Sequence, residues 1–200
     1  MTRIGFAIAA LSLLALLPAK SVNAQAADTP FQVGVVTNDL TRGDSLVAFS
    51  NTGASATTTT NGGLCVSVYA MAAANGTGPA PVSACCSCRV QANGLATASV
   101  NNDVLAGVAP RPKTAVLKLM ASTGVAGACN ASTVGTGANV LVTGMVAWQG
   151  APQPAQLGAV GSPNIPFTPS TLSAAELSRL NTQCGNFSNR TCNAVCAAGP

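Results

Sequence analysis

Eight cysteines in a chain of 200 residues constrain this sequence more than any other feature. They form two clusters of three and two single positions: Cys65; Cys85, Cys86 and Cys88; Cys129; and Cys184, Cys192 and Cys196. An even number of cysteines in an exported chain is typical of a disulfide framework, and eight cysteines allow about 105 connectivities. The dense Cys85-Cys86-Ser87-Cys88 could instead supply thiolates to zinc or an iron–sulfur cluster. Because the chain has no histidine, we favour disulfides and predict no metal and no cofactor.

The N-terminus has the pattern of a secretory signal peptide over residues 1–24. Arg3 precedes an apolar run from Ile4 to Leu17, and Val22-Asn23-Ala24 supplies the small residues of a cleavage site. The apolar run is shorter than the roughly 20 residues that a membrane-spanning helix needs. We therefore expect cleavage after Ala24, no membrane span afterwards, and a secreted or periplasmic protein of bacterial type.

The mature part, residues 25–200, is long enough for one domain with a core. Loss of Arg3 and Lys20 with the signal peptide lowers the formal net charge from +4 to about +2, and no basic run remains. Such a weak charge does not fit a nucleic-acid-binding protein. Only 7% of the residues are charged, so the surface must rely on small polar side chains.

Short apolar runs between turn-forming residues predict a mainly β fold. The clearest runs are Phe31–Thr37, Ser45–Ser50, Leu64–Met71, Thr114–Ala121 and Asn139–Trp148. In the third run, apolar residues alternate along one face. The runs 89–92 and 95–100 flank Asn93-Gly94, a dipeptide favoured in type I′ turns, so we predict a hairpin there.

These strands predict an antiparallel β-sandwich over residues 25–149. Alternation within the strands predicts that several side chains are mainly buried: Phe49, Val66, Val68, Leu117, Leu119 and Leu141. Gly144, inside the last run, indicates a bulge or a close approach of two backbones.

The C-terminal part predicts a strap, a helix and a cysteine-rich tail. Five prolines between Gly150 and Pro169 interrupt regular structure, so residues 150–169 form a linker or a strap across the sheets. Residues 170–200 are then expected to pack on the sandwich. A helix is predicted over Ala174–Cys184, with Ser173 as cap, Glu176 bonding back to the cap amide, a Leu172–Leu177 staple and Gly185 as stop.

Three features suggest catalysis or adhesion, and none of them carries a function. Gly43-Asp44-Ser45-Leu46 matches the GDSL esterase signature, but that serine needs a basic partner and the chain has no histidine. The overlapping Arg42-Gly43-Asp44 spells an adhesion tripeptide, a common chance match in a turn. The five mature carboxylates, Asp28, Asp39, Asp44, Asp103 and Glu176, stand in turns or at the helix cap. We predict no catalytic residue. Among the mature aromatic residues, Trp148 is the best candidate to reach the surface, although packing in the core or at its rim is favoured.

The cysteine pairing can be narrowed but not fixed. With full oxidation, each cluster of three must send at least one bond outside itself. Cys85 and Cys86 are unsuited to each other, because neighbouring Cα atoms are about 3.8 Å apart and a disulfide needs roughly 4.4–6.8 Å. Cys85–Cys88 is the feasible internal pair, Cys65 is the natural partner of Cys86, and Cys129 is expected to tie the tail to the sandwich.

Several segments together resemble a group of uncharacterised exported bacterial proteins with a Cys-Cys-Ser-Cys motif. The segments are residues 63–70, 83–88, 93–95, 102–105 and 172–177. The resemblance implies a bacterial source and a shared fold, but no activity and no site residues.

Two classes of function remain open at this point. The first is a non-catalytic exported protein that acts by surface interaction or assembly, with a protein or glycan partner or with itself. The alternative is an exported hydrolase, or a domain associated with one, that uses carboxylates. The alternative requires a concave pocket in which at least two acidic groups converge.

Overall fold

The computed structural model describes residues 29–38, 44–55, 62–72, 78–124, 129–150, 165–187 and Cys192. The signal peptide predicted at residues 1–24 lies outside these residues, as do Asp28, Asp39 and Cys196. The described part is mainly antiparallel β structure with one C-terminal helix, as predicted. Its strands are β1 (Phe31–Thr37), β2 (Leu46–Asn51), β3 (Leu64–Met71), β4 (Val82–Val90), β5 (Leu95–Ser99), β6 (Thr114–Thr123), β7 (Met145–Gly150), β8 (Ile165–Pro166) and β9 (Thr168–Pro169).

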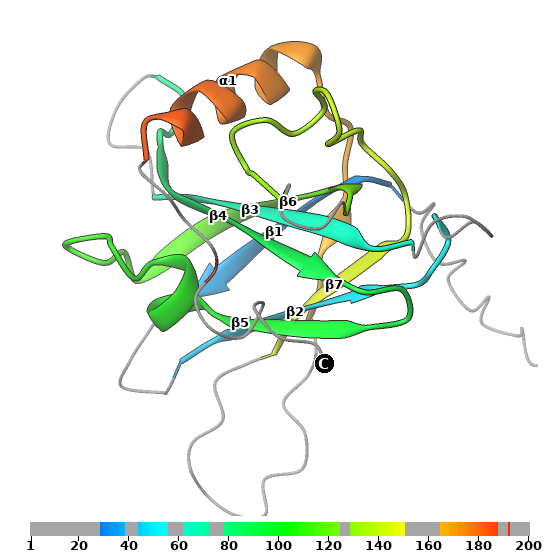
Figure 1. The fold of residues 1–200 in the computed structure, drawn as a ribbon. Helices are drawn as coiled ribbons and strands as arrows, with labels where there is room; N and C mark the ends of the chain where they lie inside the picture. Colours follow the sequence, from blue (N-terminus) through cyan, green and yellow to red (C-terminus); the bar gives the residue numbers. More distant parts are fainter. Residues whose placement is uncertain are drawn as a thin grey trace, which may run out of the picture.

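The strands form two sheets that pack face to face (Figure 1). The five-stranded sheet, here called sheet A, has the order β4-β3-β6-β1-β9, and the four-stranded sheet B has the order β5-β2-β7-β8. Helix α1 (Ala174–Gly185) lies on the outer side of sheet A (Figure 1). The architecture is therefore a sandwich with a third, helical layer on one side.

The core between the sheets contains most of the side chains predicted to be buried. Phe49, Val66, Val68, Leu117 and Leu119 are 0–1% exposed. Leu141 is only partly buried, contrary to the prediction, because the chain before β7 is irregular there and meets β6 through one isolated bridge. Strand β7 accordingly begins at Met145, not at Asn139.

A second core covers the outer face of sheet A. It includes Phe31, Tyr69, Met120 and Leu180, the last from α1. The hydroxyl of Tyr69 donates a hydrogen bond to the Ala131 carbonyl at 2.6 Å. Because this second core lies opposite the first, every residue of the interior strand β3 is buried.

The hairpin predicted at Asn93-Gly94 is wrong. Strand β4 pairs with β3 in sheet A, whereas β5 pairs with β2 in sheet B. The turn between them closes with a bond from the Gly94 N–H to the Gln91 carbonyl, and Asn93 takes a positive φ of 59°. The segment therefore carries the chain from one sheet to the other instead of reversing it within one sheet.

Helix α1 begins where its sequence predicts. The Ser173 side chain accepts a hydrogen bond from the Glu176 N–H at 3.1 Å, as an N-cap should. The Glu176 carboxylate does not complete the predicted capping box, because its oxygens bond to Lys118 and Arg179. Gly185 is the last helical residue, and Asn186 caps the helix in a right-handed conformation.

Residues 165–169 cross from one sheet to the other at the β1–β7 side of the sandwich. β8 pairs with β7, and two residues later β9 pairs with β1. Between them Phe167 is 4% exposed and packs in the core, while its N–H bonds to the Ala147 carbonyl. Residues 165–169 thereby close part of the space between the two sheets on this side.

The opposite side of the sandwich, at β4, is fastened by disulfides. Cys85 bonds to Cys184 in α1, and Cys86 bonds to Cys192, whose N–H also contacts the Ser87 carbonyl at 3.4 Å. Alternate residues of a strand point to opposite faces, so these two bonds tie C-terminal cysteines to the two faces of β4. A third bond joins Cys65 to Cys129.

The predicted cysteine pairs are wrong, and the strand geometry explains why. Cys85 belongs to the outer core, whereas Cys86 and Cys88 belong to the core between the sheets. A Cys85–Cys88 bond would have to cross the sheet. Cys65 has the same difficulty with Cys86, and Cys129 bonds to Cys65 instead of to the tail.

Candidate interaction site at the open edge of strand β1

Among the residues that the structure describes, strand β1 is paired along its whole length on one side only. It pairs with β6 from Phe31 to Thr37, but β9 covers only Gln32 and Val33 on the other side. The bonds Ala121 N–H to Pro30 carbonyl and Asn38 N–H to Lys113 carbonyl place the even-numbered residues in the bonded pairs with β6. By the alternation of an antiparallel ladder, Val35 and Thr37 direct their N–H and C=O groups to the open side.

A groove of about 440 Å³ adjoins this open edge. Its lining comes from three places in the chain: residues 33–35 of β1, Gln149 of β7, and residues 165–168 with Ser170 of the crossing segment. Two apolar side chains beside it are well exposed, Val35 at 64% and Ile165 at 54%. A volume of this size is in the range of specific ligand sites.

The groove exists because the crossing segment pairs with β1 at only two residues. Phe167 turns into the core beside Gly34, where a Cβ would stand 2.7 Å from its ring, so only glycine fits there. The residues just before Phe167 form β8, which pairs with β7 and not with β1. Gln149, only 6% exposed, lines the space between them, and its side chain forms no hydrogen bond with any residue that the structure describes.

No known protein family, curated protein or solved structure matches the chain.

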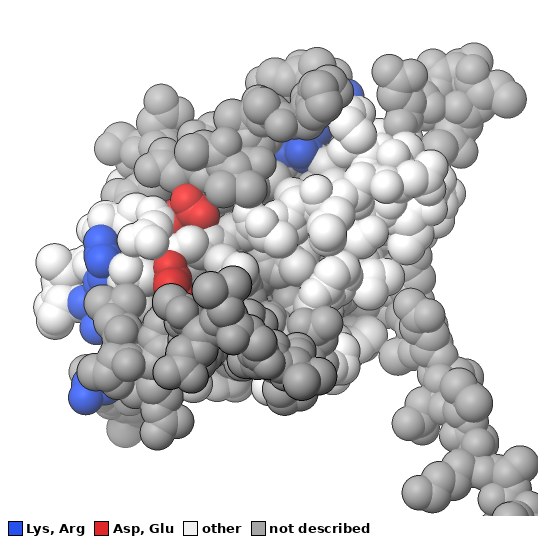
Figure 2. Space-filling model, turned by 90° about the horizontal axis from the view of Figure 1, so that it is seen from below, with Lys and Arg blue, Asp and Glu red and all other residues white. Residues whose placement is uncertain are grey.

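Two of the carboxylates come together, at the start of β2. Asp44 accepts hydrogen bonds from the Ser99 hydroxyl and from the Asn101 N–H, the latter at 3.0 Å. Asp103 accepts from the Ser99 N–H at 2.7 Å. Both carboxylates thereby fasten the π-helical turn η1 (Val100–Val104) to the sandwich. On the face seen in Figure 2, the acidic side chains in view lie toward one end, with several basic side chains beyond them.

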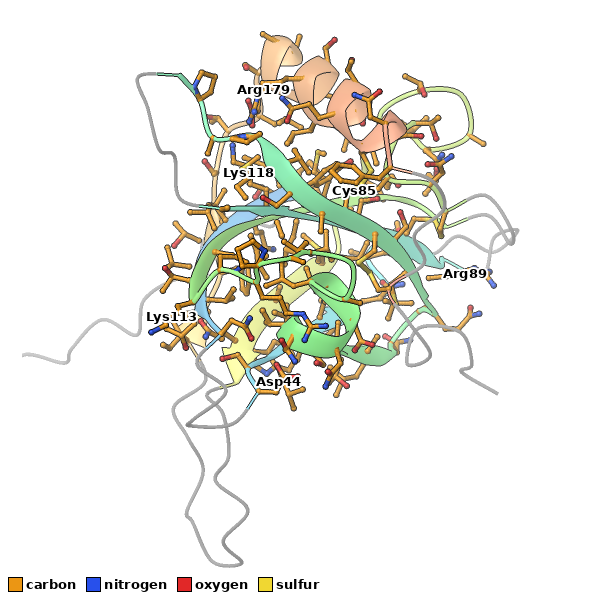
Figure 3. The ribbon with its side chains drawn as sticks, turned by 90° about the vertical axis from the view of Figure 1, so that its left-hand side faces the viewer. Asp44, Cys85, Arg89, Lys113, Lys118 and Arg179 are labelled. Atoms are coloured by element: carbon orange, nitrogen blue, oxygen red, sulfur yellow. A yellow bond between two sulfur atoms is a disulfide. The ribbon has the colours of Figure 1, made fainter. Side chains whose placement is uncertain are left out.

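Glu176, the third described carboxylate, joins α1 to sheet A. It bonds to Arg179 at 2.8 and 2.9 Å and also to Lys118 of β6. Figure 3 shows Lys118 and Arg179 between the sheet and the helix, on the opposite side of the molecule from Asp44. The hydrogen bonds from Arg179, with a smaller effect of Lys118, lower the pKa of Glu176 from 4.5 to about 2.

The esterase-like and adhesion-like motifs have structural roles where they are described. Ser45 is 0% exposed and its carbonyl accepts the Val100 N–H, so the hydroxyl is not presented as a nucleophile. Arg42 and Gly43 lie outside the described residues. Trp148, the best candidate for a surface aromatic residue, is half-buried in β7.

Cys85, Cys86 and Cys88 are all disulfide-bonded, which leaves the Cys-Cys-Ser-Cys motif without thiolates for a metal. The partner of Cys88 lies outside the described residues. Within the part of the chain that the structure describes, no group of three or more acidic, cysteine or histidine residues is placed to hold a metal ion. Among the same residues, no helix is long and apolar enough to cross a membrane.

Sequence reasoning missed the groove, although one signal pointed to it. Ile165-Pro166-Phe167-Thr168-Pro169 combines strand-forming residues with prolines, and proline within a sheet is confined mainly to edges. This pattern marks the segment as an edge strand. The sequence does not say which edge it covers, or that it leaves half of β1 open.

Proposed function

We propose that the chain is an exported bacterial protein, secreted or periplasmic, that acts without catalysis by binding a partner through its surface. The observation that carries the proposal is the open edge of β1 beside the groove. There an unpaired strand edge, exposed apolar side chains and a buried polar side chain meet. An exposed strand edge can pair with other chains, so proteins normally cover or protect such edges. An edge left open is therefore a candidate binding site.

Export is supported by two independent features. The first is the signal-peptide pattern of residues 1–24. The second is the disulfide framework, because disulfides persist in oxidising compartments. N-terminal sequencing of the protein recovered from the periplasm and the medium of an expressing bacterium tests the proposal. We expect Gln25 as the first residue, and an intact Met1 in the cytoplasm would contradict it.

The binding role is tested with the exported protein as immobilised bait in the medium and periplasmic extract of the producing bacterium. Bound proteins are identified by mass spectrometry and bound glycans by sugar analysis, and self-association is measured separately by sedimentation. We expect a specific partner of one of these classes that a blank resin does not retain. Absence of all three would contradict an interaction role.

A further inference from the structure

We infer that the groove beside β1 binds an extended, uncharged peptide segment of a partner protein, which adds to sheet A as a further strand along β1. This inference rests on the proposed interaction role and specifies its partner. Strand addition is a common mode of peptide recognition, in which main-chain hydrogen bonds give affinity and side-chain contacts give specificity.

The hydrogen-bonding pattern of β1 supplies the first argument. Val35 and Thr37 face the open side with N–H and C=O groups, and no residue that the structure describes pairs with Val35 on that side. These groups are spaced to bond a second backbone in extended conformation. The regular spacing of these N–H and C=O groups matches an extended peptide backbone better than a small molecule.

The same edge already binds a strand in this way. β9 runs antiparallel along Gln32 and Val33, and the Ser170 N–H bonds to the Phe31 carbonyl. An added strand would continue the line of β9 along the rest of β1. The first half of the edge thus provides an internal example of the binding mode.

The lining of the groove indicates the chemistry of the segment. It contains no charged residue, and its exposed apolar side chains include Val35 and Ile165. A charged side chain would lose hydration here without gaining an ion pair. Gln149 offers one amide for a hydrogen bond, so we expect an apolar, β-branched segment with one polar group facing the groove.

The size of the edge favours a peptide over a second copy of the chain. The open part, Gly34–Thr37, is about 13 Å long at roughly 3.3 Å per residue. Stable specific interfaces between folded proteins bury roughly 1,200–2,000 Å². Edge pairing of two copies over four residues is far smaller, whereas a peptide can fill both the edge and the groove.

The test uses peptides selected from a displayed library of random linear sequences against the exported protein. Val35→Pro removes the outward N–H but keeps the bonds to β6, and proline is tolerated at sheet edges. Val35→Asp places a charge at the edge. The matched controls are Val35→Thr, which keeps both the N–H and the β-branch, and Leu95→Asp, which charges an exposed residue of β5. Circular dichroism verifies that each variant is folded.

We expect uncharged, β-branched peptides whose binding is at least about tenfold weaker with Val35→Pro and Val35→Asp, a loss of about 1.4 kcal/mol, and little changed with the two controls. Failure to enrich any peptide, or equal binding to all variants, would overturn the inference. Dimerisation that Val35→Pro abolishes would assign the edge to a second copy and overturn it as well.

Retention of the natural partner on wild-type and variant baits distinguishes a failure of this inference from a failure of the proposed function. A partner retained by wild-type and Val35→Pro baits alike would leave the interaction role in place and overturn the assignment to β1. A partner lost only from the Val35→Pro and Val35→Asp baits, and recovered on Val35→Thr, supports both.

Discussion

At the scale of single residues, Tyr69 is the most buried polar aromatic group of the molecule. Its side chain is 0% exposed, and burial raises the pKa of its hydroxyl well above the ordinary value of 10. The folded state therefore favours the neutral phenol. The stability that this provides is complete below pH 10 and is lost as the pH rises further, because the unfolded chain then ionises.

We predict that tyrosinate absorbance and loss of circular dichroism rise together above pH 10. The chain has one tyrosine, so the absorbance reports this residue alone. Tyr69→Phe should lower the free energy of unfolding by about 1–2 kcal/mol at pH 7, because it leaves the Ala131 carbonyl without its partner. That difference should shrink above pH 10. Ionisation near pH 10 in a folded protein would show that Tyr69 is accessible.

The contact between Gly34 and Phe167 gives a second prediction at this scale. Gly34→Ala should lower the free energy of unfolding by about 1–3 kcal/mol, because the new methyl group meets a ring held between the sheets. Phe167→Ala should cost about 3–5 kcal/mol through the cavity it leaves. Urea unfolding of the double variant should show less than the sum of the two losses, and full additivity would contradict the contact.

At the scale of elements, each segment could be predicted where its structure follows from its own residues. Leu64–Met71 alternates and forms β3 with the predicted bounds, and Ser173 caps α1. The Asn93-Gly94 hairpin failed because a local turn signal does not say which sheet the next strand joins. The predicted bond from the Glu176 carboxylate to the cap amide is absent, because Lys118, distant in sequence, competes for this carboxylate.

Because Glu176 forms ion pairs between α1 and sheet A, we predict that its contribution to the free energy of unfolding depends on pH. A carboxyl group with a lowered pKa stabilises the fold above pH 4.5, and this contribution is lost as the pH falls toward 2. Glu176→Gln should therefore lower the free energy of unfolding by about 1 kcal/mol at pH 7 and by almost nothing near pH 2. Ser173→Ala, the control, should cost about 1 kcal/mol at both pH values. Equal pH profiles for the two variants would contradict this role of Glu176.

At the scale of the whole molecule, composition and periodicity predict the β class and the helical C-terminus, but not the cystine partners. A partner depends on which face of β4 a cysteine occupies and on what packs against that face. The groove was also beyond the sequence, because β1, β7 and the crossing segment meet there only after both sheets have formed.

Disulfide mapping provides the fourth prediction. Peptides from the non-reduced protein should contain Cys65–Cys129, Cys85–Cys184 and Cys86–Cys192. Cys88 is also disulfide-bonded, and Cys196 is the one cysteine left, so we expect a Cys88–Cys196 peptide. A Cys85–Cys88 or Cys65–Cys86 peptide would contradict the arrangement of the two cores around sheet A.

The most direct test of the central claim is the rate of amide hydrogen exchange along β1 in the free exported protein. Gly34 and Val36 belong to the bonded pairs with β6, whereas the N–H of Val35 faces the open edge. Exchange should therefore be slow at Gly34 and Val36, as in a sheet interior, and orders of magnitude faster at Val35. Equal protection of the three amides would show that the edge is already covered, and would contradict its role as a binding site.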